Sequence, residues 1–320
     1  MTGRHPARRR AGRRGALGVL VAMALLLTGC SSGVLPAPTA ASDARKHVMI
    51  LTGSAIGYCA HRPLEEWPAS VTRVVVAVHG MDRNACGMLA SVTEALGGEA
   101  SGEAPTVAVI APVFSTWLDA APGGHVWDAR GWPAGDASST GASSYQVMDD
   151  LIEAVGDRKV TLVGFSGGGQ FVNRYASVSP RAAHRYVVVN PSSYLWFTPD
   201  RPTSDPCREA NRWRYGLDER YGYAAESDAD TIRARYATRD VRYFIGTNDN
   251  DPRSLSMDRS CGAMAQGSNR GDRAVNYHRH LIEAFGEAID ARQPLTVVPG
   301  VGHDARAMLV SPEARAALTG

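Results

Sequence analysis

The sequence lacks three features that would each indicate a particular class of protein. Its five cysteines include no C-x-x-C pair, which argues against a zinc site. It shows no internal duplication, which argues against a solute receptor built from two similar lobes. The apolar run at residues 16–27 is 12 residues long, whereas a membrane-spanning helix requires about 20. We therefore expect neither a metal ion, nor a cofactor, nor a spanning segment.

Acidic residues are absent from the first 29 positions, and this absence explains the net charge of the chain. The same segment carries six arginines, and without them the formal net charge changes from +2 to −4. The positive net charge therefore comes from a targeting segment and does not indicate a nucleic-acid partner. The six arginines are Arg4, Arg8, Arg9, Arg10, Arg13 and Arg14.

The N-terminal segment has the layout of an export signal. Arginines precede the apolar run, and the run ends in Leu-Thr-Gly-Cys at Cys30, which resembles a bacterial lipobox. We predict a lipoprotein-type signal peptide at 1–29, lipidation of Cys30, and a flexible tether at 30–45 that is small, Pro-containing and non-periodic. The expected location is the outer side of the cell membrane. The alternative is an ordinary signal peptide with a chance cysteine.

The other four cysteines form an even set in a chain predicted to be exported. Oxidising compartments favour disulfides, so two bridges are expected, although buried free thiols are an alternative. Three pairings of four cysteines are possible. Proximity along the chain favours Cys59 with Cys86 and Cys207 with Cys261.

From residue 46 to 320, strand-like and helix-like stretches alternate, which predicts a mainly parallel, doubly wound α/β sheet flanked by helices. Residues 195–240 interrupt the alternation and suggest an inserted, cap-like segment. The predicted strands are 47–51, 72–78, 106–111, 160–165, 186–190, 241–245 and 295–298. The predicted helices are 145–155, the stretch after 169, 272–289 and 305–318.

One predicted strand runs directly into the motif Gly164-Phe165-Ser166-Gly167-Gly168, which is G-x-S-x-G. At a sharp strand-to-helix turn, glycines two positions from the serine avoid clashes and leave its hydroxyl exposed at the edge of the sheet. The following helix directs its N–H groups at the same point. We therefore predict that Ser166 is a nucleophile, against the alternative of an incidental serine in a glycine-rich turn.

A nucleophilic serine requires donors for the oxyanion and a base. The strand at 72–78 is followed by His79-Gly80, so the predicted oxyanion donors are the backbone N–H groups of Met81 and Gly167, with His79 structural. Of the nine histidines, His303 is the predicted base, because it lies in a glycine-rich loop between the last strand and the last helix.

The predicted acid follows another strand, at 241–245. Asp249 is favoured and Asp251, which precedes a proline, is the alternative. The order Ser166, Asp249, His303 is the order of the nucleophile, acid and base in α/β-hydrolases.

These motifs give the chain a resemblance to the α/β-hydrolase superfamily. It is similar to secreted bacterial and fungal serine hydrolases at 190–196, 211–221, 260–273 and 300–304, with Phe165 where many relatives carry histidine. The resemblance implies acyl-transfer chemistry through Ser166, Asp249 and His303. It leaves the acyl group open.

We therefore expect an exported serine esterase acting on an acyl-ester or other small-molecule substrate. The alternatives are a non-catalytic binding lipoprotein of the same fold and an acyltransferase using the same three residues. Clustered aromatic residues are candidates for a pocket wall, although packing of long loops explains them equally well. They are Trp127, Trp132, Tyr194, Trp196, Trp213 and Tyr215.

Overall fold

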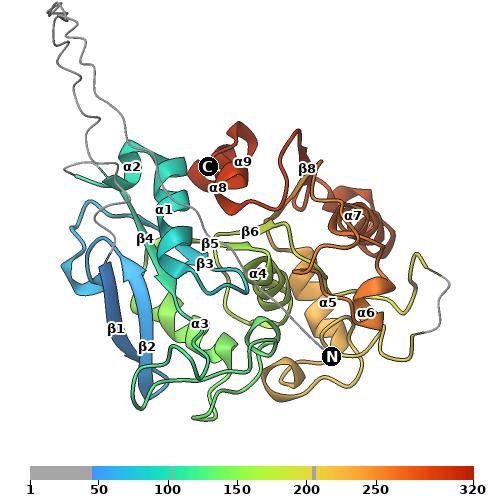
Figure 1. Cartoon of the computed structure of the whole chain (residues 1–320), viewed down its shortest axis with the longest axis horizontal. Helices are drawn as coiled ribbons and strands as arrows, with labels where there is room; N and C mark the ends of the chain where they lie inside the picture. The colour runs from blue at the N-terminus through green and yellow to red at the C-terminus, as the bar shows by residue number, and fades with distance from the viewer. Residues whose placement is uncertain (1–44, 102–103, 204–206) are drawn as a thin grey trace, which may run out of the picture. The chain divides into compact units, whose positions relative to one another are not determined.

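The computed structural model describes residues 45–101, 104–203 and 207–320, which build one mixed sheet with helices on both faces (Figure 1). The predicted signal peptide, Cys30 and nearly all of the predicted tether lie outside the described residues. In the ranges described, no helix combines the length and the apolar character needed to cross a bilayer.

The sheet has eight strands, of which β2 runs antiparallel to both of its neighbours, while the other five pairings are all parallel. The mainly parallel, doubly wound sheet expected from the sequence is thus confirmed. In spatial order the strands are β1 (Arg45–Leu51), β2 (Ser54–Ala60), β4 (Val107–Pro112), β3 (Arg73–Val78), β5 (Lys159–Phe165), β6 (Arg185–Val189), β7 (Val241–Gly246) and β8 (Leu295–Val298).

Helices cover the two faces of the sheet (Figure 1). One face carries α1 (Ala85–Leu96), α8 (Ala305–Leu309) and α9 (Pro312–Thr319). The other carries α3 (Ser144–Ala154), α4 (Gly167–Val178), α5 (Ala229–Ala237) and α7 (Arg270–Phe285). The remaining helical turns are α2 (Gly98–Ser101), α6 (Cys261–Met264), η2 (Leu64–Glu66), η3 (Trp132–Ala134), η4 (Gly222–Ala225) and η5 (Glu287–Ile289).

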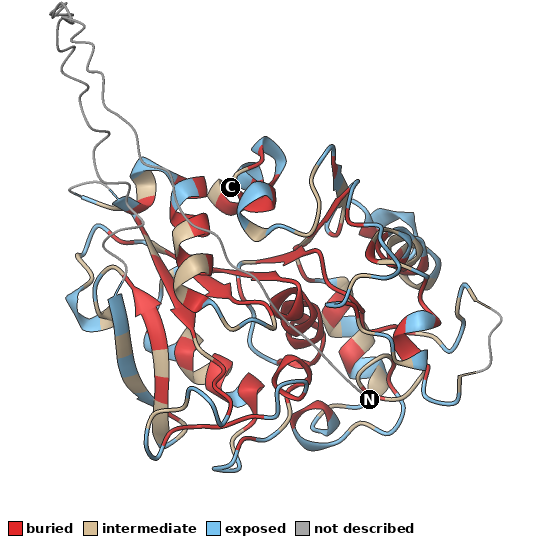
Figure 2. Cartoon of the chain, in the orientation of Figure 1, coloured by how far each residue is buried: buried red, intermediate tan, exposed pale blue. Residues whose placement is uncertain are grey.

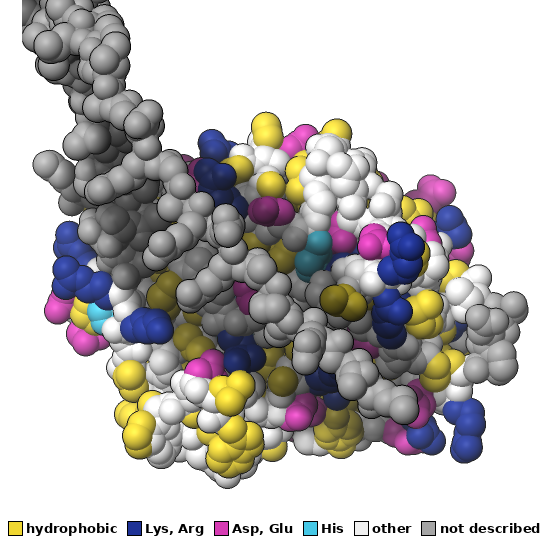
Figure 3. All heavy atoms as spheres, in the orientation of Figure 1, with side chains coloured by type: hydrophobic (Ala, Val, Ile, Leu, Met, Phe, Trp, Pro, Cys, Tyr) yellow, Lys and Arg dark blue, Asp and Glu magenta, His cyan; other side chains and the backbone are white. Residues whose placement is uncertain are grey.

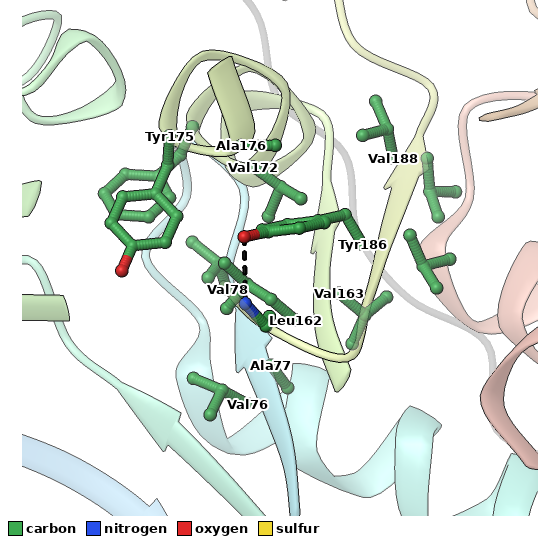
Figure 4. Close-up of a cluster of buried hydrophobic side chains, with 14 of the residues drawn as sticks. Val76, Ala77, Val78, Leu162, Val163, Val172, Tyr175, Ala176, Tyr186 and Val188 are labelled. Atoms are coloured by element: carbon green, nitrogen blue, oxygen red, sulfur yellow. Dashed lines mark hydrogen bonds between the residues drawn. The ribbon is translucent and has the colours of Figure 1, made fainter. Parts of the chain in front are cut away.

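The core lies around α4 and the central strands. All residues of α4 are buried, and the valines of β3 are buried on both faces of the sheet, as its continuous apolar run requires (Figure 2). Figure 4 shows Val172, Tyr175 and Ala176 of α4 near side chains of β3, β5 and β6. Burying each aliphatic side chain of this size stabilises the fold by about 1.5–3 kcal/mol. The turn between β5 and α4, which carries Ser166, therefore lies against the buried core.

The elements that the sequence pattern did not predict include β2 and α1. β2 (Ser54–Ala60) pairs with β1 as a hairpin, and its Gly-Tyr-Cys-Ala sequence carries no clear alternation. α1 begins after Asn84, whose side chain accepts a hydrogen bond from the backbone N–H of Gly87 and so caps the helix.

Two helix boundaries also differ from the predicted ones. The expected helix at 305–318 is two helices, because Ser311 caps a new helix that starts at Pro312, and proline lacks the N–H needed to continue the first. The expected helix at 272–289 ends at Phe285, because Gly286 has a φ of 84° and turns the chain.

The predicted cap-like segment at 195–240 contains both irregular chain and a helix of the main fold. α5 lies within it and packs on α4, so it belongs to the helical layer over the sheet and is the crossover between β6 and β7. The irregular part begins with Leu195, Trp196 and Phe197, all of them buried.

Two disulfides are present, and they are the pairs that proximity favoured. Cys59 bonds to Cys86 and Cys207 bonds to Cys261, with sequence separations of 27 and 54. By the loss of loop-closure entropy in the unfolded chain, bridges of these spans contribute about 3.5 and 4 kcal/mol to stability. The first ties β2 to α1, next to the loop that follows β3.

Candidate active site

Ser166 occupies the turn between β5 and α4 with a backbone conformation that few residues other than glycine adopt. Its φ is 55° and its ψ is −113°. Gly164 and Gly168 permit this turn, because a Cβ on Gly164 would lie 2.1 Å from the carbonyl oxygen of Gly168, and a Cβ on Gly168 would lie 2.2 Å from that of Val78. The strained turn thus points the Ser166 side chain out of the strand end.

The structure brings Ser166, His303 and Asp249 into one hydrogen-bonded series. Ser166 Oγ lies 3.0 Å from His303 Nε2, and His303 Nδ1 lies 2.7 Å from Asp249 Oδ2. With a carboxylate at Nδ1, that nitrogen carries the proton and Nε2 is left as the acceptor facing Ser166. In this arrangement the imidazole can take a proton from the serine hydroxyl.

The loop that carries His303 is fixed by the chain after β7. The backbone N–H of Asn248 donates to the carbonyl of Val301 at 2.9 Å, and the Asn248 side chain donates to the carbonyl of Gly300 at 3.0 Å. The ring of Phe165 lies 4.7 Å from that of His303, centroid to centroid. The imidazole is therefore positioned both by the turn after β7, through Asn248, and by the end of β5, through Phe165.

Asp249 is 4% exposed and is surrounded by donors. Asn190 Nδ2 donates to the same oxygen as His303, at 2.7 Å, and Arg270 Nη1 donates to the other oxygen at 3.1 Å. Burial alone would raise the pKa of the Asp249 carboxyl, but the hydrogen bonds from His303 and Asn190 and the charges of His303 and Arg270 outweigh it and lower that pKa. The carboxylate is held in its charged form.

Arg270 and Asn190 are the site residues that sequence analysis did not identify. Arg270 is 1% exposed and also donates to the hydroxyl groups of Ser254 and Ser256. Asn190 directly follows β6 with a φ of 48°, a conformation that asparagine tolerates better than most residues. An asparagine immediately after a buried strand was the one available signal.

The buried Arg270–Asp249 ion pair predicts a pH-dependent loss of stability in the Arg270→Gln variant. Removing one partner of a buried pair leaves an uncompensated charge and costs about 3–5 kcal/mol. Because Arg270 helps to depress the pKa of Asp249, its stabilising effect is present above the unfolded carboxyl pKa of about 4 and is lost as pH falls below it. Denaturant unfolding at pH 7 and at pH 3 should show the difference between variant and wild type shrinking at the lower pH.

Arg253→Gln is the matched control for that measurement. Arg253 forms an ion pair with Asp251 at 3.7 Å in the same loop, but its side chain is 90% exposed. Solvent screens such a pair, so its loss should cost less than about 0.5 kcal/mol at either pH. Equal losses in the two variants, or a loss for Arg270→Gln that grows as the pH falls, would contradict the assigned role of the buried pair.

Two backbone N–H groups converge beside Ser166. A Cβ on Gly167 would lie 3.3 Å from the backbone nitrogen of Met81, and a Cβ on Gly80 would lie 3.6 Å from the Cβ of Ser166. No acceptor within the described residues receives a hydrogen bond from the N–H of Met81 or of Gly167. The two predicted oxyanion donors are therefore close together and available to a ligand.

His79 fixes the peptide group between Gly80 and Met81. Its ring is fully buried, which lowers its pKa to about 4 and keeps it neutral. Nε2 accepts from the backbone N–H of Phe114 at 3.0 Å, so Nδ1 carries the proton and donates to the carbonyl of Gly80 at 2.7 Å. Because the N–H of a trans peptide points opposite to its C=O, fixing the Gly80 carbonyl also aims the N–H of Met81. His79 is a structural residue, as expected.

Other predicted candidates lie away from the series. Asp251 accepts from the backbone N–H of Arg253 and makes no contact with His303. In the ranges that the structure covers, no group of three or more His, Cys, Asp or Glu side chains is arranged to hold a metal ion. The sixth clustered aromatic residue, Tyr215, donates a hydrogen bond to Asp258. The other five are buried, in agreement with packing: Trp127, Trp132, Tyr194, Trp196 and Trp213.

A hollow of about 770 Å³ lies far from this site. It is lined by residues at the amino end of β4, among them Pro105 and Val107, and by Arg45, His61 and Trp67. In a parallel sheet, functional residues gather at the carboxyl ends of the strands, where Ser166 and Asp249 lie. The candidate active site is therefore the hydrogen-bonded series and not this hollow.

Comparison with known proteins supports the fold assignment. Neither a protein-family model nor a curated protein matches the sequence. Among solved structures, poly(aspartic acid) hydrolase-1 from Sphingomonas sp. KT-1 aligns with a TM-score of 0.64 at 21% identity, over 87% of this chain and 98% of that one. LpqC, a poly(3-hydroxybutyrate) depolymerase from Bordetella parapertussis, aligns with a TM-score of 0.61 at 22% identity, over 88% and 98%. This chain shares their fold.

Proposed function

We propose that this chain, which has the α/β-hydrolase fold implied by its sequence, is a serine hydrolase that cleaves carboxylic esters. The observation that carries the proposal is the continuous series of hydrogen bonds from Ser166 through His303 to Asp249, beside two N–H groups without protein acceptors. The poly(3-hydroxybutyrate) depolymerase of similar fold supports esters as the substrate class.

The proposed reaction uses each of these groups in turn. Ser166 Oγ attacks the carbonyl carbon while His303 Nε2 takes its proton, and the carboxylate of Asp249 stabilises the imidazolium that results. The N–H groups of Met81 and Gly167 donate to the oxyanion, an interaction that contributes about 10²–10³-fold to kcat per donor in such sites. His303 then gives the proton to the leaving alcohol. Water then attacks the acyl carbon while His303 Nε2 takes a proton from it, the bond to Ser166 Oγ breaks, and His303 returns the proton to Oγ as the carboxylic acid leaves.

We further propose that the enzyme is exported and anchored through a lipid on Cys30. The support is the sequence of the first 30 residues, together with two disulfides of the kind that form in oxidising compartments. Fatty-acid labelling of the producing cells tests this proposal. The label should be incorporated into the wild-type protein and be absent from the Cys30→Ser variant.

A fluorophosphonate probe tests the proposed chemistry, because it modifies only an activated serine. The purified protein should gain one probe, on the peptide that contains Ser166, and the Ser166→Ala variant should gain none. A panel of acyl esters of different chain length, one matched amide, and an added alcohol acceptor then separates esterase, amidase and acyltransferase activity. Absence of both labelling and turnover would instead favour a non-catalytic binding protein.

A further inference from the structure

The most exposed large apolar side chains of the described residues all lie on loops at the edge of the sheet that carries Ser166. Trp117 is 81% exposed, Leu118 is 90% exposed and Leu255 is 100% exposed. Trp117 and Leu118 follow the carboxyl end of β4, and Leu255 follows the carboxyl end of β7. We call these three side chains the apolar tips. Hydrophobic side chains also gather along the lower rim of the face seen in Figure 3.

Hydrogen bonds tie the first pair of tips to the oxyanion loop. Asp119 accepts from the backbone N–H of Thr116 at 2.7 Å, which closes the turn that presents Trp117 and Leu118. The other Asp119 oxygen accepts from Nε of Arg83 at 2.9 Å, and Arg83 lies two residues after Met81. The turn is therefore held beside the loop that supplies the Met81 N–H.

The third tip is tied to the acid side of the site. Leu255 lies between Ser254 and Ser256, and both hydroxyl groups accept from the guanidinium of Arg270. The same guanidinium donates to Asp249. The apolar tips thus lie on two loops. One is hydrogen-bonded to the loop that contains Met81, and the other to Arg270, which contacts Asp249, so hydrogen bonds hold both loops in place.

The high exposure of the apolar tips limits the kind of ligand that can bury them. Side chains more than 80% exposed have no protein wall around them, so one small dissolved ester cannot desolvate tips on both loops together. An extended apolar surface can desolvate the tips on both loops at the same time. The charged residues within two positions of the tips each have an opposite charge beside them, Asp119 an ion pair with Arg83 and the exposed Arg253 a loose pair with Asp251. Neither loop therefore carries an excess of one charge next to a tip, and the tips suit an uncharged surface.

We propose that the apolar tips dock the enzyme onto the surface of an undissolved, uncharged aliphatic ester, so that ester groups at that surface reach Ser166. This proposal rests on the proposed esterase function. Trp117 and Leu118 also line a hollow of about 480 Å³, together with Val126 and Trp127. This hollow has room for an aliphatic segment that protrudes from the ester surface.

Tributyrin tests the proposal, because one ester can be supplied dissolved, below its solubility limit, or as droplets above it. For the wild type the rate should rise steeply once droplets form. For Trp117→Ser/Leu118→Ser/Leu255→Ser the ratio of droplet rate to dissolved rate should fall at least about tenfold, because each lost contact weakens partition onto the surface. The matched control, Val48→Ser/Ile50→Ser, removes exposed apolar area from β1, four strands away from β5, and should keep the wild-type ratio.

A binding measurement separates this proposal from the proposed function. The Ser166→Ala protein should co-sediment with tributyrin droplets, and the same protein with the three tip substitutions should not, whether or not the wild type hydrolyses any ester. A triple variant that keeps both the rate ratio and droplet binding overturns the proposal. Binding to phosphatidylcholine or phosphatidylglycerol vesicles but not to droplets also overturns it, in favour of a membrane surface.

Discussion

Ser166→Ala should lower kcat for ester hydrolysis by about 10⁶-fold with little change in KM. The hydroxyl is the proposed attacking group, and removing a serine nucleophile eliminates the covalent route, while substrate binding and the oxyanion donors remain. The substitution should fold normally, because alanine carries the same Cβ as serine through the turn at φ 55°. Steady-state kinetics on a soluble ester, with unfolding midpoints for both proteins, measure the effect.

Ser177→Ala is the control that separates the nucleophile from a structural serine. Ser177 lies in α4, as a buried residue whose hydroxyl donates only to the carbonyl of Asn173 within the helix. Its loss should change kcat less than about twofold. If the Ser166→Ala protein retains more than about 1% of wild-type activity while Ser177→Ala is normal, Ser166 is not the nucleophile.

The features predicted correctly are those encoded by short, local patterns. The valine-rich run before Ser166 marks a strand buried on both faces, and the glycines at 164 and 168 mark a turn at which only small residues fit. His303 was singled out because it lies in a glycine-rich loop after the final strand, and the structure places its Nε2 3.0 Å from Ser166 Oγ. Each of these signals lies within about ten residues of the site residue itself.

The residues that escaped prediction act across long distances in the sequence. Arg270 contacts Asp249 from the first turn of α7, and nothing around Arg270 distinguishes it from other arginines that begin a helix. The choice between Asp249 and Asp251 was open for the same reason: both follow β7, and only the direction of the turn places one of them beside His303. Side-chain direction in a loop depends on tertiary contacts that a local pattern does not encode.

Trp117 and Leu118 illustrate the opposite limit. The sequence assigned them no role, whereas the buried Trp127 and Trp132 were candidates for the pocket wall. Exposure depends on which way the braced turn at Asp119 faces, and that is set by the ion pair with Arg83, 36 positions away. The buried Trp127 and Trp132 agree with the packing alternative, whereas the exposure of Trp117 and Leu118 depends on a tertiary contact that composition does not encode.

Asp249→Asn should lower kcat by about 10⁴-fold, because an amide cannot satisfy the donors that surround this position. Asp249 accepts from His303 and Asn190 on one oxygen and from Arg270 on the other. If the new NH₂ group faces Arg270, two donors oppose each other. If it faces His303, it donates to Nδ1, so Nε2 carries the proton and cannot accept one from Ser166. Both orientations are unfavourable, and the second also gives the wrong tautomer of the base.

Asp251→Asn is the control for the Asp249 substitution, since it changes the same charge two residues away. Its side chain caps the backbone N–H of Arg253 in an exposed turn, so kcat should fall less than about threefold. The two measurements on one soluble ester distinguish the alternatives that the sequence left open. A large loss for Asp251→Asn together with a small loss for Asp249→Asn would mean that the acid turn rearranges when substrate binds, and the hydrogen-bonded series would not be the working arrangement.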